Sequence, residues 1–293
     1  MLVLAFLCPA LLIANPAGTI AVTIDDLPCV GPRTRSVKEN IERLVRHLAK
    51  AQVVPTGFVC GDRDNFQAMQ AWIQAGFPLG NHTYSHVGLS QMSPQAYITD
   101  IERNEKVYRE NCLVELRGGF FRFPFLDHGN SEEKVQALES FFKRAPYRIA
   151  HVSLDTIDYR FALEYAKPKQ QKMIHTMYIN HVEECANHFA SMSLLLFQRR
   201  IPLILLIHAN ELNADCLGDV LTRLSQKGWL FVSLEAAMED SVYQAYVHRP
   251  PLVRCPGDRN FLNQISLSRG ITALDISGDK YFQEYWLPLI RKQ

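Results

Sequence analysis

Short runs of β-branched, aromatic and other apolar residues alternate along most of this chain with longer stretches in which apolar residues recur at helical spacing. Each short run ends at polar residues, proline or glycine, which predicts a buried strand rather than a helix. The predicted strands cover residues 20–24, 56–60, 77–80, 120–125, 147–152, 201–207 and 229–232. The predicted helices cover residues 36–48, 65–75, 93–111, 131–143, 171–200 and 217–227, and residues 153–160 are expected to form a loop.

The alternation of strand and helix predicts an α/β fold with a parallel sheet, right-handed crossovers and helices on both faces. In a closed β/α barrel the carboxyl ends of the strands form one rim, and in an open sheet they form one edge. Polar residues that directly follow the strands are therefore expected to meet at one place.

Acids, histidines and an arginine stand at five of these strand ends, within residues 23–26, 82–86, 122–125, 155–159 and 206–208. Taken alone, Asp25 and Asp26 could form a solvated turn before Pro28. Two histidines in a polar loop, such as His82 and His86, are more often surface residues than metal ligands. Imidazoles at this spacing can nevertheless bind one metal ion if the backbone turns them together.

Composition narrows the class of protein. The chain has 293 residues, of which 47% are hydrophobic and 21% charged, and this excludes a mostly disordered chain. The formal net charge is +1 and no dense basic stripe is present, so we expect no nucleic-acid partner.

The first fourteen residues are apolar and uncharged, and they resemble the hydrophobic region of a secretory signal peptide, although a basic segment before it is missing. We predict a leader over residues 1–17, a secreted or periplasmic location, and no stable membrane insertion after leader removal. Two alternatives for these residues remain open: they could form a buried strand, or the start of the chain could be misassigned. Removal of Cys8 would leave six cysteines, which permits disulfides, but buried thiols explain them equally well.

The strand and helix pattern stops near residue 241. We therefore expect a main domain over residues 18–240 and a C-terminal extension over residues 241–293 that packs on it, with a short helix near residues 281–291.

The five strand-end segments, in this order and spacing, resemble the polysaccharide deacetylase family, also called NodB homology or carbohydrate esterase family 4, over about residues 20–239. The resemblance implies a deformed (β/α) barrel with about seven parallel strands. It also implies a divalent metal ion, usually Zn²⁺, held by Asp26, His82 and His86. Because successive side chains of a strand point to opposite sides, Asp26 can face the metal while Asp25 faces the attacking water.

The same resemblance implies the catalytic groups. Asp25 would act as general base and Arg122 would pair with it, while His208 would act as general acid supported by Asp158. Hydrolysis of an amide or ester needs such groups, because water is a poor nucleophile and the leaving amine must be protonated.

Three further residues are implied on the substrate side. The backbone N–H of Phe125 would stabilise the negative charge of the intermediate, Leu206 would line a pocket for the acetyl methyl, and Tyr159 would pack against a sugar ring. The family commonly has tyrosine and tryptophan where Phe125 and Tyr159 stand here. The substitutions leave backbone donation and ring stacking in place, but they put the substrate preference in question.

The function implied is a metal-dependent hydrolase of amide bonds other than peptide bonds. It would remove acetyl groups from an N-acetylated or O-acetylated glycan, such as a chitin-like polymer, peptidoglycan or xylan. Two alternatives remain open: a non-catalytic carbohydrate-binding homologue, and a deformylase or amidohydrolase of the same fold.

Overall fold

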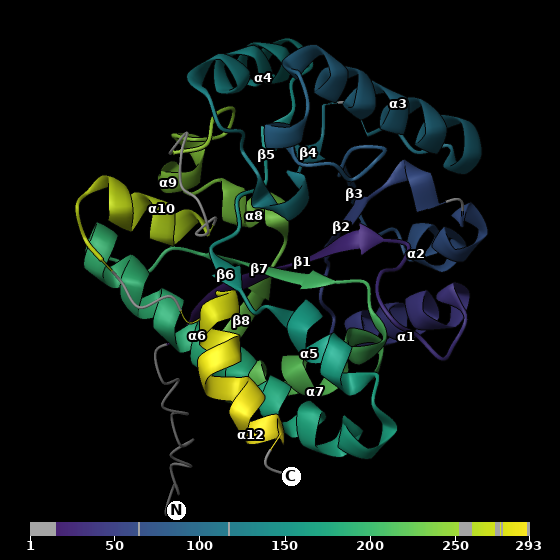
Figure 1. The fold of residues 1–293 in the computed structure, drawn as a ribbon, viewed down its shortest axis with the longest axis vertical. Helices are drawn as coiled ribbons and strands as arrows, with labels where there is room; N and C mark the ends of the chain where they lie inside the picture. Colours follow the sequence, from purple (N-terminus) through teal and green to yellow (C-terminus); the bar gives the residue numbers. More distant parts are fainter. Residues whose placement is uncertain are drawn as a thin grey trace, which may run out of the picture.

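The computed structural model describes residues 16–63, 65–116, 118–251, 260–272, 276 and 278–291. Apart from its last two residues, the predicted leader lies outside this part of the chain. Within the described residues, eight strands form one sheet in the order β5-β4-β3-β2-β1-β7-β6, with β8 also paired to β1 (Figure 1). The strands are β1 (Gly18–Leu27), β2 (Thr56–Val59), β3 (Leu79–Asn81), β4 (Phe120–Phe121), β5 (Arg148–Ile149), β6 (Leu154–Asp155), β7 (Leu203–His208) and β8 (Trp229–Val232).

Every strand pairing is parallel, which confirms the predicted deformed (β/α) barrel. Strand β1 is its centre, because β7 pairs along one edge of β1 while β2 and β8 share the other edge. Among the described residues, no ladder joins β5 to β6, so hydrogen bonds between strands do not close the barrel.

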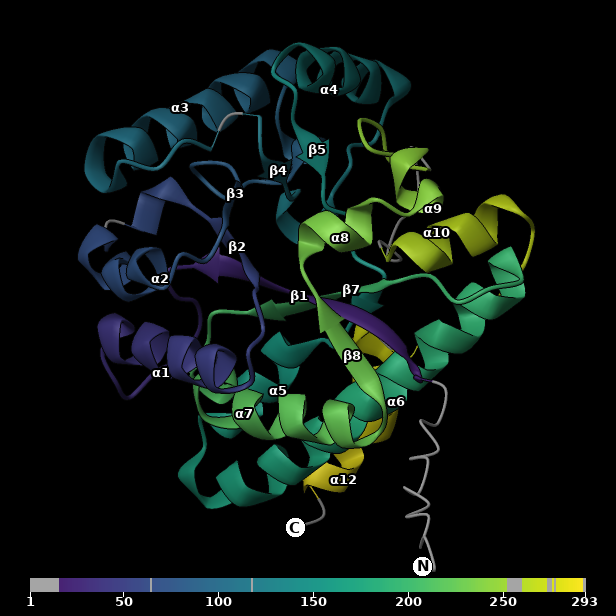
Figure 2. The same ribbon diagram turned by 180° about the vertical axis from the view of Figure 1, so that it is seen from behind.

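Helices cover the sheet on its outer side. They are α1 (Val37–Lys50), α2 (Gln70–Gln74), α3 (Pro94–Cys112), α4 (Glu132–Arg144), α5 (Asp158–Tyr165), α6 (Gln171–Phe197), α7 (Glu211–Gln226) and α8 (Leu234–Met238). Figure 2 shows α1 and α7 side by side, and their apolar faces join the main core around β1. A second core, rich in aromatic residues, lies under α3 and α4.

Several predicted boundaries differ from the structure. The predicted strand at 120–125 ends at Phe121, because Pro124 begins a 3₁₀ turn that runs to Leu126. The loop expected at 153–160 contains β6 and the start of α5. Helix α7 begins at Glu211 rather than at residue 217, because the side chain of Asn210 accepts a hydrogen bond from the third residue beyond it and caps the helix.

The C-terminal segment contains α9 (Ser241–Gln244), α10 (Phe261–Ser268), α11 (Asp279–Tyr281) and α12 (Leu287–Arg291). The backbone N–H of Ile149 donates to the carbonyl of Val247, and that of Phe261 donates to Val152. Backbone groups at and just beyond the end of β5, on the open side of the barrel, are thus satisfied by the extension. The proposed division at residue 240 stays a prediction.

The described part of the chain contains no helix long and apolar enough to cross a membrane. Its five cysteines form no disulfide with one another, and Cys8 and Cys255 lie outside the described residues.

Candidate active site

The two acids at the end of β1 face the same group of side chains. Asp26 has a positive φ of 64°, so the alternation expected for a regular strand does not hold there. The Nε2 atom of His82 lies 3.8 Å from Oδ2 of Asp25 and 3.8 Å from Oδ1 of Asp26. The expected opposite orientation of the two carboxylates is therefore wrong, and a backbone kink brings both to His82.

The loop after β3 turns the two histidines toward each other. Thr83 and His86 both have positive φ, and the carboxylate of Asp100 on α3 accepts hydrogen bonds from the backbone N–H groups of Tyr84 and Ser85. The rings of His82 and His86 lie 5.0 Å apart between centroids. The Nε2 atom of His86 is 2.9 Å from Oδ1 of Asp26, so the three predicted metal ligands converge.

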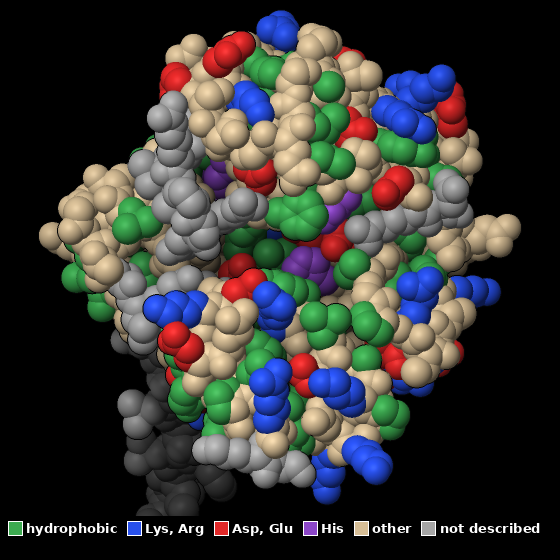
Figure 3. All heavy atoms as spheres, in the orientation of Figure 1, with side chains coloured by type: hydrophobic (Ala, Val, Ile, Leu, Met, Phe, Trp, Pro, Cys, Tyr) green, Lys and Arg blue, Asp and Glu red, His purple; other side chains and the backbone are tan. Residues whose placement is uncertain are grey.

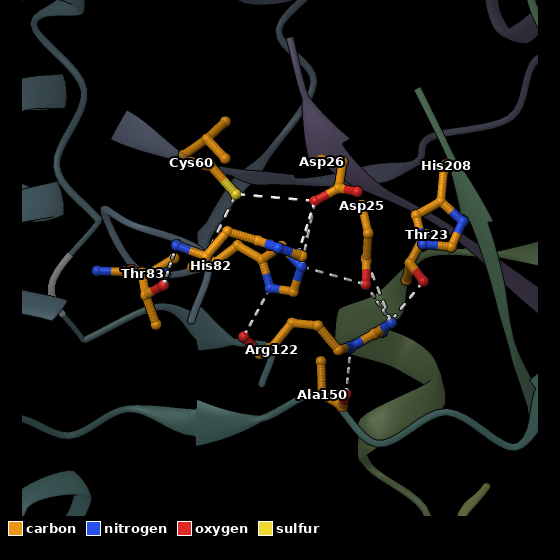
Figure 4. A network of polar contacts seen from close by, with 12 residues as sticks. Thr23, Asp25, Asp26, Cys60, His82, Thr83, Arg122, Ala150 and His208 are labelled. Atoms are coloured by element: carbon orange, nitrogen blue, oxygen red, sulfur yellow. Dashed lines mark hydrogen bonds and ion pairs between the residues drawn. The ribbon is translucent and has the colours of Figure 1, made fainter. Parts of the chain in front are cut away.

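The convergence includes a fourth side chain, Cys60, which directly follows β2. Ligand atoms of Asp26, Cys60, His82 and His86 all lie within 4.8 Å of one another. Figure 4 shows Cys60, Asp26 and His82 side by side. Nδ1 of His82 lies 2.7 Å from the carbonyl oxygen of Arg122, which can only accept, so Nδ1 carries the proton and Nε2 is left to bind a metal. Carboxylate, imidazole and thiol donors at these distances fit a divalent ion such as Zn²⁺.

Burial, and to a smaller extent the electrostatic effect of the neighbouring His86 ring, hold the pKa of His82 well below its ordinary value. A neutral imidazole is the form that binds a metal, so this buried position suits a ligand.

Asp25 is held by a buried arginine. Nη1 of Arg122 lies 3.3 Å from each oxygen of Asp25, and its other nitrogens donate to the carbonyl of Ala150 and the hydroxyl of Thr23. Both Arg122 and Asp25 are almost completely buried. Burial raises the pKa of Asp25 to about 6, against the opposing effect of the Arg122 charge. The expected pairing of Arg122 with Asp25 is present.

His208, at the end of β7, is paired with Asp158 at the start of α5. Nδ1 of His208 donates to Oδ1 of Asp158 at 2.7 Å, and the other carboxylate oxygen accepts from the backbone of His208 and the side chains of Asn210 and Asn213. Burial lowers the pKa of His208, but the Asp158 carboxylate outweighs it, and the pKa is raised to about 10. The expected His–carboxylate pair is therefore formed.

Two of the three residues expected on the substrate side contact histidines of this centre. The ring of Phe125 is 58% exposed and lies edge-on to His86, with centroids 4.5 Å apart. The ring of Tyr159 lies 5.9 Å from that of His208. Leu206 packs with Leu126 and Val152 in a small apolar cluster separate from the main cores.

Figure 3 shows histidine and acidic side chains at the bottom of a hollow near the centre of this face, with hydrophobic side chains around it. The predicted metal ligands, the two predicted catalytic pairs, Phe125 and Tyr159 thus lie around one centre. The sequence prediction missed the residues that support it, namely Thr23, Cys60, Asp100, Asn210 and Asn213. Cys60 could have been found from its position, because it is the last residue of the predicted strand at 56–60 and therefore stands at the same rim as Asp25 and His208.

Comparison with known proteins confirms the resemblance. The family model described as polysaccharide deacetylase matches residues 13–141, which include the metal cluster and Arg122 but end before Asp158 and His208. A curated relative, the peptidoglycan-N-acetylglucosamine deacetylase of Bacillus cereus, is 27% identical over 143 residues. That match covers 48% of this chain and 46% of the relative, so the chain spans less than half the length of the curated relative it matches.

Solved structures share the fold. The peptidoglycan deacetylase PdaC from Bacillus subtilis matches with a TM-score of 0.53 at 18% identity, over 79% of this chain and 96% of that one. A CE4 family pseudoenzyme from Bacillus anthracis matches with a TM-score of 0.54 at 17% identity, over 75% of this chain and 65% of that one. At identities of 17% and 18%, these structures show that the fold is shared and do not show the activity of this chain.

Proposed function

With residues 13–141 assigned to the polysaccharide deacetylase family, we propose that the chain hydrolyses the acetamido group of an N-acetylated glycan, using one divalent metal ion. The observation that carries the proposal is the juxtaposition of three units at one rim. These are the metal-ligating cluster, the Asp25–Arg122 pair and the His208–Asp158 pair. A binding module needs none of this proton-transfer machinery, whereas amide hydrolysis needs all of it.

In the proposed reaction, Asp26, His82 and His86 would hold the metal ion. When bound there, Zn²⁺ would acidify water and polarise the acetyl carbonyl. Asp25 accepts the proton of the attacking water, and Arg122 keeps this carboxylate in position.

The leaving amine takes its proton from His208. Asp158 binds Nδ1–H of this ring and so leaves Nε2 as the nitrogen that faces the substrate. The backbone N–H of Phe125 is proposed to stabilise the charge on the carbonyl oxygen. The apolar cluster of Leu206, Leu126 and Val152 offers a surface for the acetyl methyl, and the exposed rings of Phe125 and Tyr159 offer stacking surfaces for sugars.

Peptidoglycan is the first glycan to test, because the curated relative is named for it. A glycan of the cell wall would require this chain to work outside the cytoplasm, which agrees with the predicted leader. Zn²⁺ is the proposed metal because two imidazoles and a carboxylate form a common catalytic zinc set.

The test is to purify the protein, measure bound metal by elemental analysis, and assay acetate release from peptidoglycan, chitin oligosaccharides and acetylated xylan. We expect bound zinc and acetate release, and loss of both in a His82→Ala, His86→Ala double variant. His175→Ala is the matched control, because His175 lies on α6 and pairs with Asp219 outside the site.

Full zinc occupancy in the double variant would contradict the ligand set. Bound zinc with no product from any glycan would support the binding alternative, and release of formate in place of acetate would support another acyl substrate.

A further inference from the structure

We propose that Cys60 is a fourth protein ligand of the metal ion, so that the site is Asp26–Cys60–His82–His86 rather than one carboxylate and two imidazoles. The inference rests on the metal site of the proposed function and extends it to a sulfur donor. It concerns which metal the chain selects and how that metal is held.

The strand order puts Cys60 between the other ligands. Cys60 directly follows β2, which lies between β1, the strand of Asp26, and β3, which leads into His82. The backbone N–H of Cys60 donates to the carbonyl of Leu27, and that of His82 donates to the carbonyl of Val59. Asp26, Cys60 and His82 therefore lie side by side at the carboxyl ends of three neighbouring strands. Cys60 is only 1% exposed, so its side chain is confined to this interior position.

The distances suit a common ion. Sγ of Cys60 lies 3.8 Å from Oδ1 of Asp26. Usual zinc–sulfur and zinc–oxygen bond lengths at a tetrahedral angle place these two atoms about 3.6 Å apart. The same calculation gives about 3.4 Å between an imidazole nitrogen and a carboxylate oxygen. In the structure, Oδ1 of Asp26 lies 2.9 Å from Nε2 of His86 and 3.8 Å from Nε2 of His82, one distance below this value and one above it. Small side-chain adjustments would bring all four donors to one ion.

The side chain points into the cluster and not into the apolar core. Figure 4 shows the sulfur of Cys60 directed toward Asp26 and His82. Sγ of Cys60 contacts Oδ1 of Asp26 and lies 3.6 Å from the carbonyl oxygen of His82. On coordination the thiol proton is released to solvent and a sulfur–metal bond forms, so that Cys–SH and M²⁺ give Cys–S⁻–M²⁺ and H⁺. No oxidant or reductant is needed.

A thiolate changes what the site can bind. Sulfur favours zinc and other late transition metals, whereas Mg²⁺ and Mn²⁺ prefer oxygen ligands. With Asp26 and Cys60 both anionic, two negative charges balance the divalent ion inside a buried site. Catalytic zinc sites with three protein ligands keep an open position, and a fourth ligand leaves room for water only if the coordination number rises to five.

The test uses Co²⁺, whose visible absorption reports binding and whose near-ultraviolet charge-transfer absorption reports a bound thiolate. Co²⁺ is titrated into metal-free wild-type protein, Cys60→Ala and Cys60→Ser. We expect the wild type to show the charge-transfer band and both Cys60 variants to lack it, with visible bands retained in both variants. The control is Cys112→Ala, because Cys112 lies at the end of α3 and is not part of the cluster. It should keep both kinds of band.

The affinity for zinc is measured by competition with a chromophoric chelator. Loss of a residue that only supports a metal ligand weakens metal binding about 10- to 100-fold. Loss of a direct ligand should cost at least as much, so the zinc affinity of Cys60→Ala should fall by at least this factor. If the variants do not fold, cadmium NMR of the wild-type protein gives the answer, because a thiolate ligand moves the cadmium resonance far downfield.

Visible cobalt bands without charge transfer in the wild type would overturn the role of Cys60 while leaving the ligands Asp26, His82 and His86 in place. Absence of any cobalt or zinc binding in the wild type would instead overturn the metal site on which the proposed function depends. A charge-transfer band that survives in Cys60→Ala but is lost in Cys112→Ala would place the thiolate elsewhere and also overturn the proposal.

Discussion

Asp25 and His208 are register partners on the adjacent parallel strands β1 and β7. The backbone N–H of Ala209 donates to the carbonyl of Asp25 at 3.0 Å, which extends the ladder to the strand ends. The proposed base and acid therefore stand on neighbouring backbones at the centre of the sheet. Their spacing is set by the strand ladder and not by a mobile loop, as preorganised catalysis requires.

Replacement of Asp25 by asparagine should abolish most of the activity without loss of metal. A correctly placed general base contributes about 10²- to 10⁴-fold to the rate, so kcat for acetate release should fall by about that factor. The zinc content should be unchanged, because Asp25 is not among the proposed ligands. Asp219→Asn, an exposed carboxylate on α7, is the control. Undiminished acetate release in Asp25→Asn would remove Asp25 from this role.

Asp158 should control the protonation of His208. The pKa of His208 is raised to about 10 chiefly because the Asp158 carboxylate outweighs the effect of burial. In Asp158→Asn the burial effect is left unopposed by that charge, so the pKa of His208 should fall markedly. An NMR titration of the metal-free protein, with the ring resonances assigned through His208→Gln, measures this directly. A His208 ring that titrates at the same pH in both proteins would contradict the pairing.

The same pair should make stability depend on pH in a defined direction. Because the folded pKa of His208 lies above its ordinary value of 6.5, its stabilising contribution is complete below that pH and is lost as the pH rises toward about 10. The free energy of unfolding of the metal-free wild type should therefore fall more steeply over this window than that of Asp158→Asn. Urea unfolding at several pH values measures both, and equal slopes would count against the ion pair.

Asp100 should affect the metal although it binds none. Its carboxylate accepts hydrogen bonds from the N–H groups of Tyr84 and Ser85 and from the hydroxyl of Ser85, which hold the turn between His82 and His86. In Asp100→Ala these donors lose their partner and the two imidazoles lose their fixed geometry. Zinc affinity should fall about 10- to 100-fold, the usual cost of a lost supporting contact. Calorimetric titration measures it, and an unchanged affinity would show that the loop is held by other contacts.

The fold could be predicted from the sequence, and so could the strand ends at which the site residues stand. Short buried apolar runs such as residues 201–207 predict strands of a parallel sheet, and parallel order then brings the strand ends together. Asp25, His82 and His208 could be assigned to one rim for this reason alone.

The parts of the structure that the sequence prediction got wrong or missed depend on contacts between residues far apart in the chain. The short β6 is held by pairing with β7, and α5 begins after Ile157 in a left-handed conformation, which no local pattern indicates. The positive φ of Asp26 is a further example, because it follows from how β1 ends against its neighbours. Asp100 was missed because a helical aspartate that bonds a distant loop looks like any surface acid in the sequence.

Arg122 should be worth more to stability than a surface charge. Both it and Asp25 are buried, and removal of one partner of a buried ion pair costs about 3–5 kcal/mol, because the other charge is left without compensation. Arg122→Met should therefore lower the free energy of unfolding by about this amount, as measured by urea denaturation at neutral pH. The double variant Arg122→Met, Asp25→Asn should recover part of the loss, since no unpaired charge remains. If the double variant is destabilised by the sum of the two single effects, the pair is not coupled. Arg122 would then act through its bonds to Ala150 and Thr23, and not as the partner of Asp25.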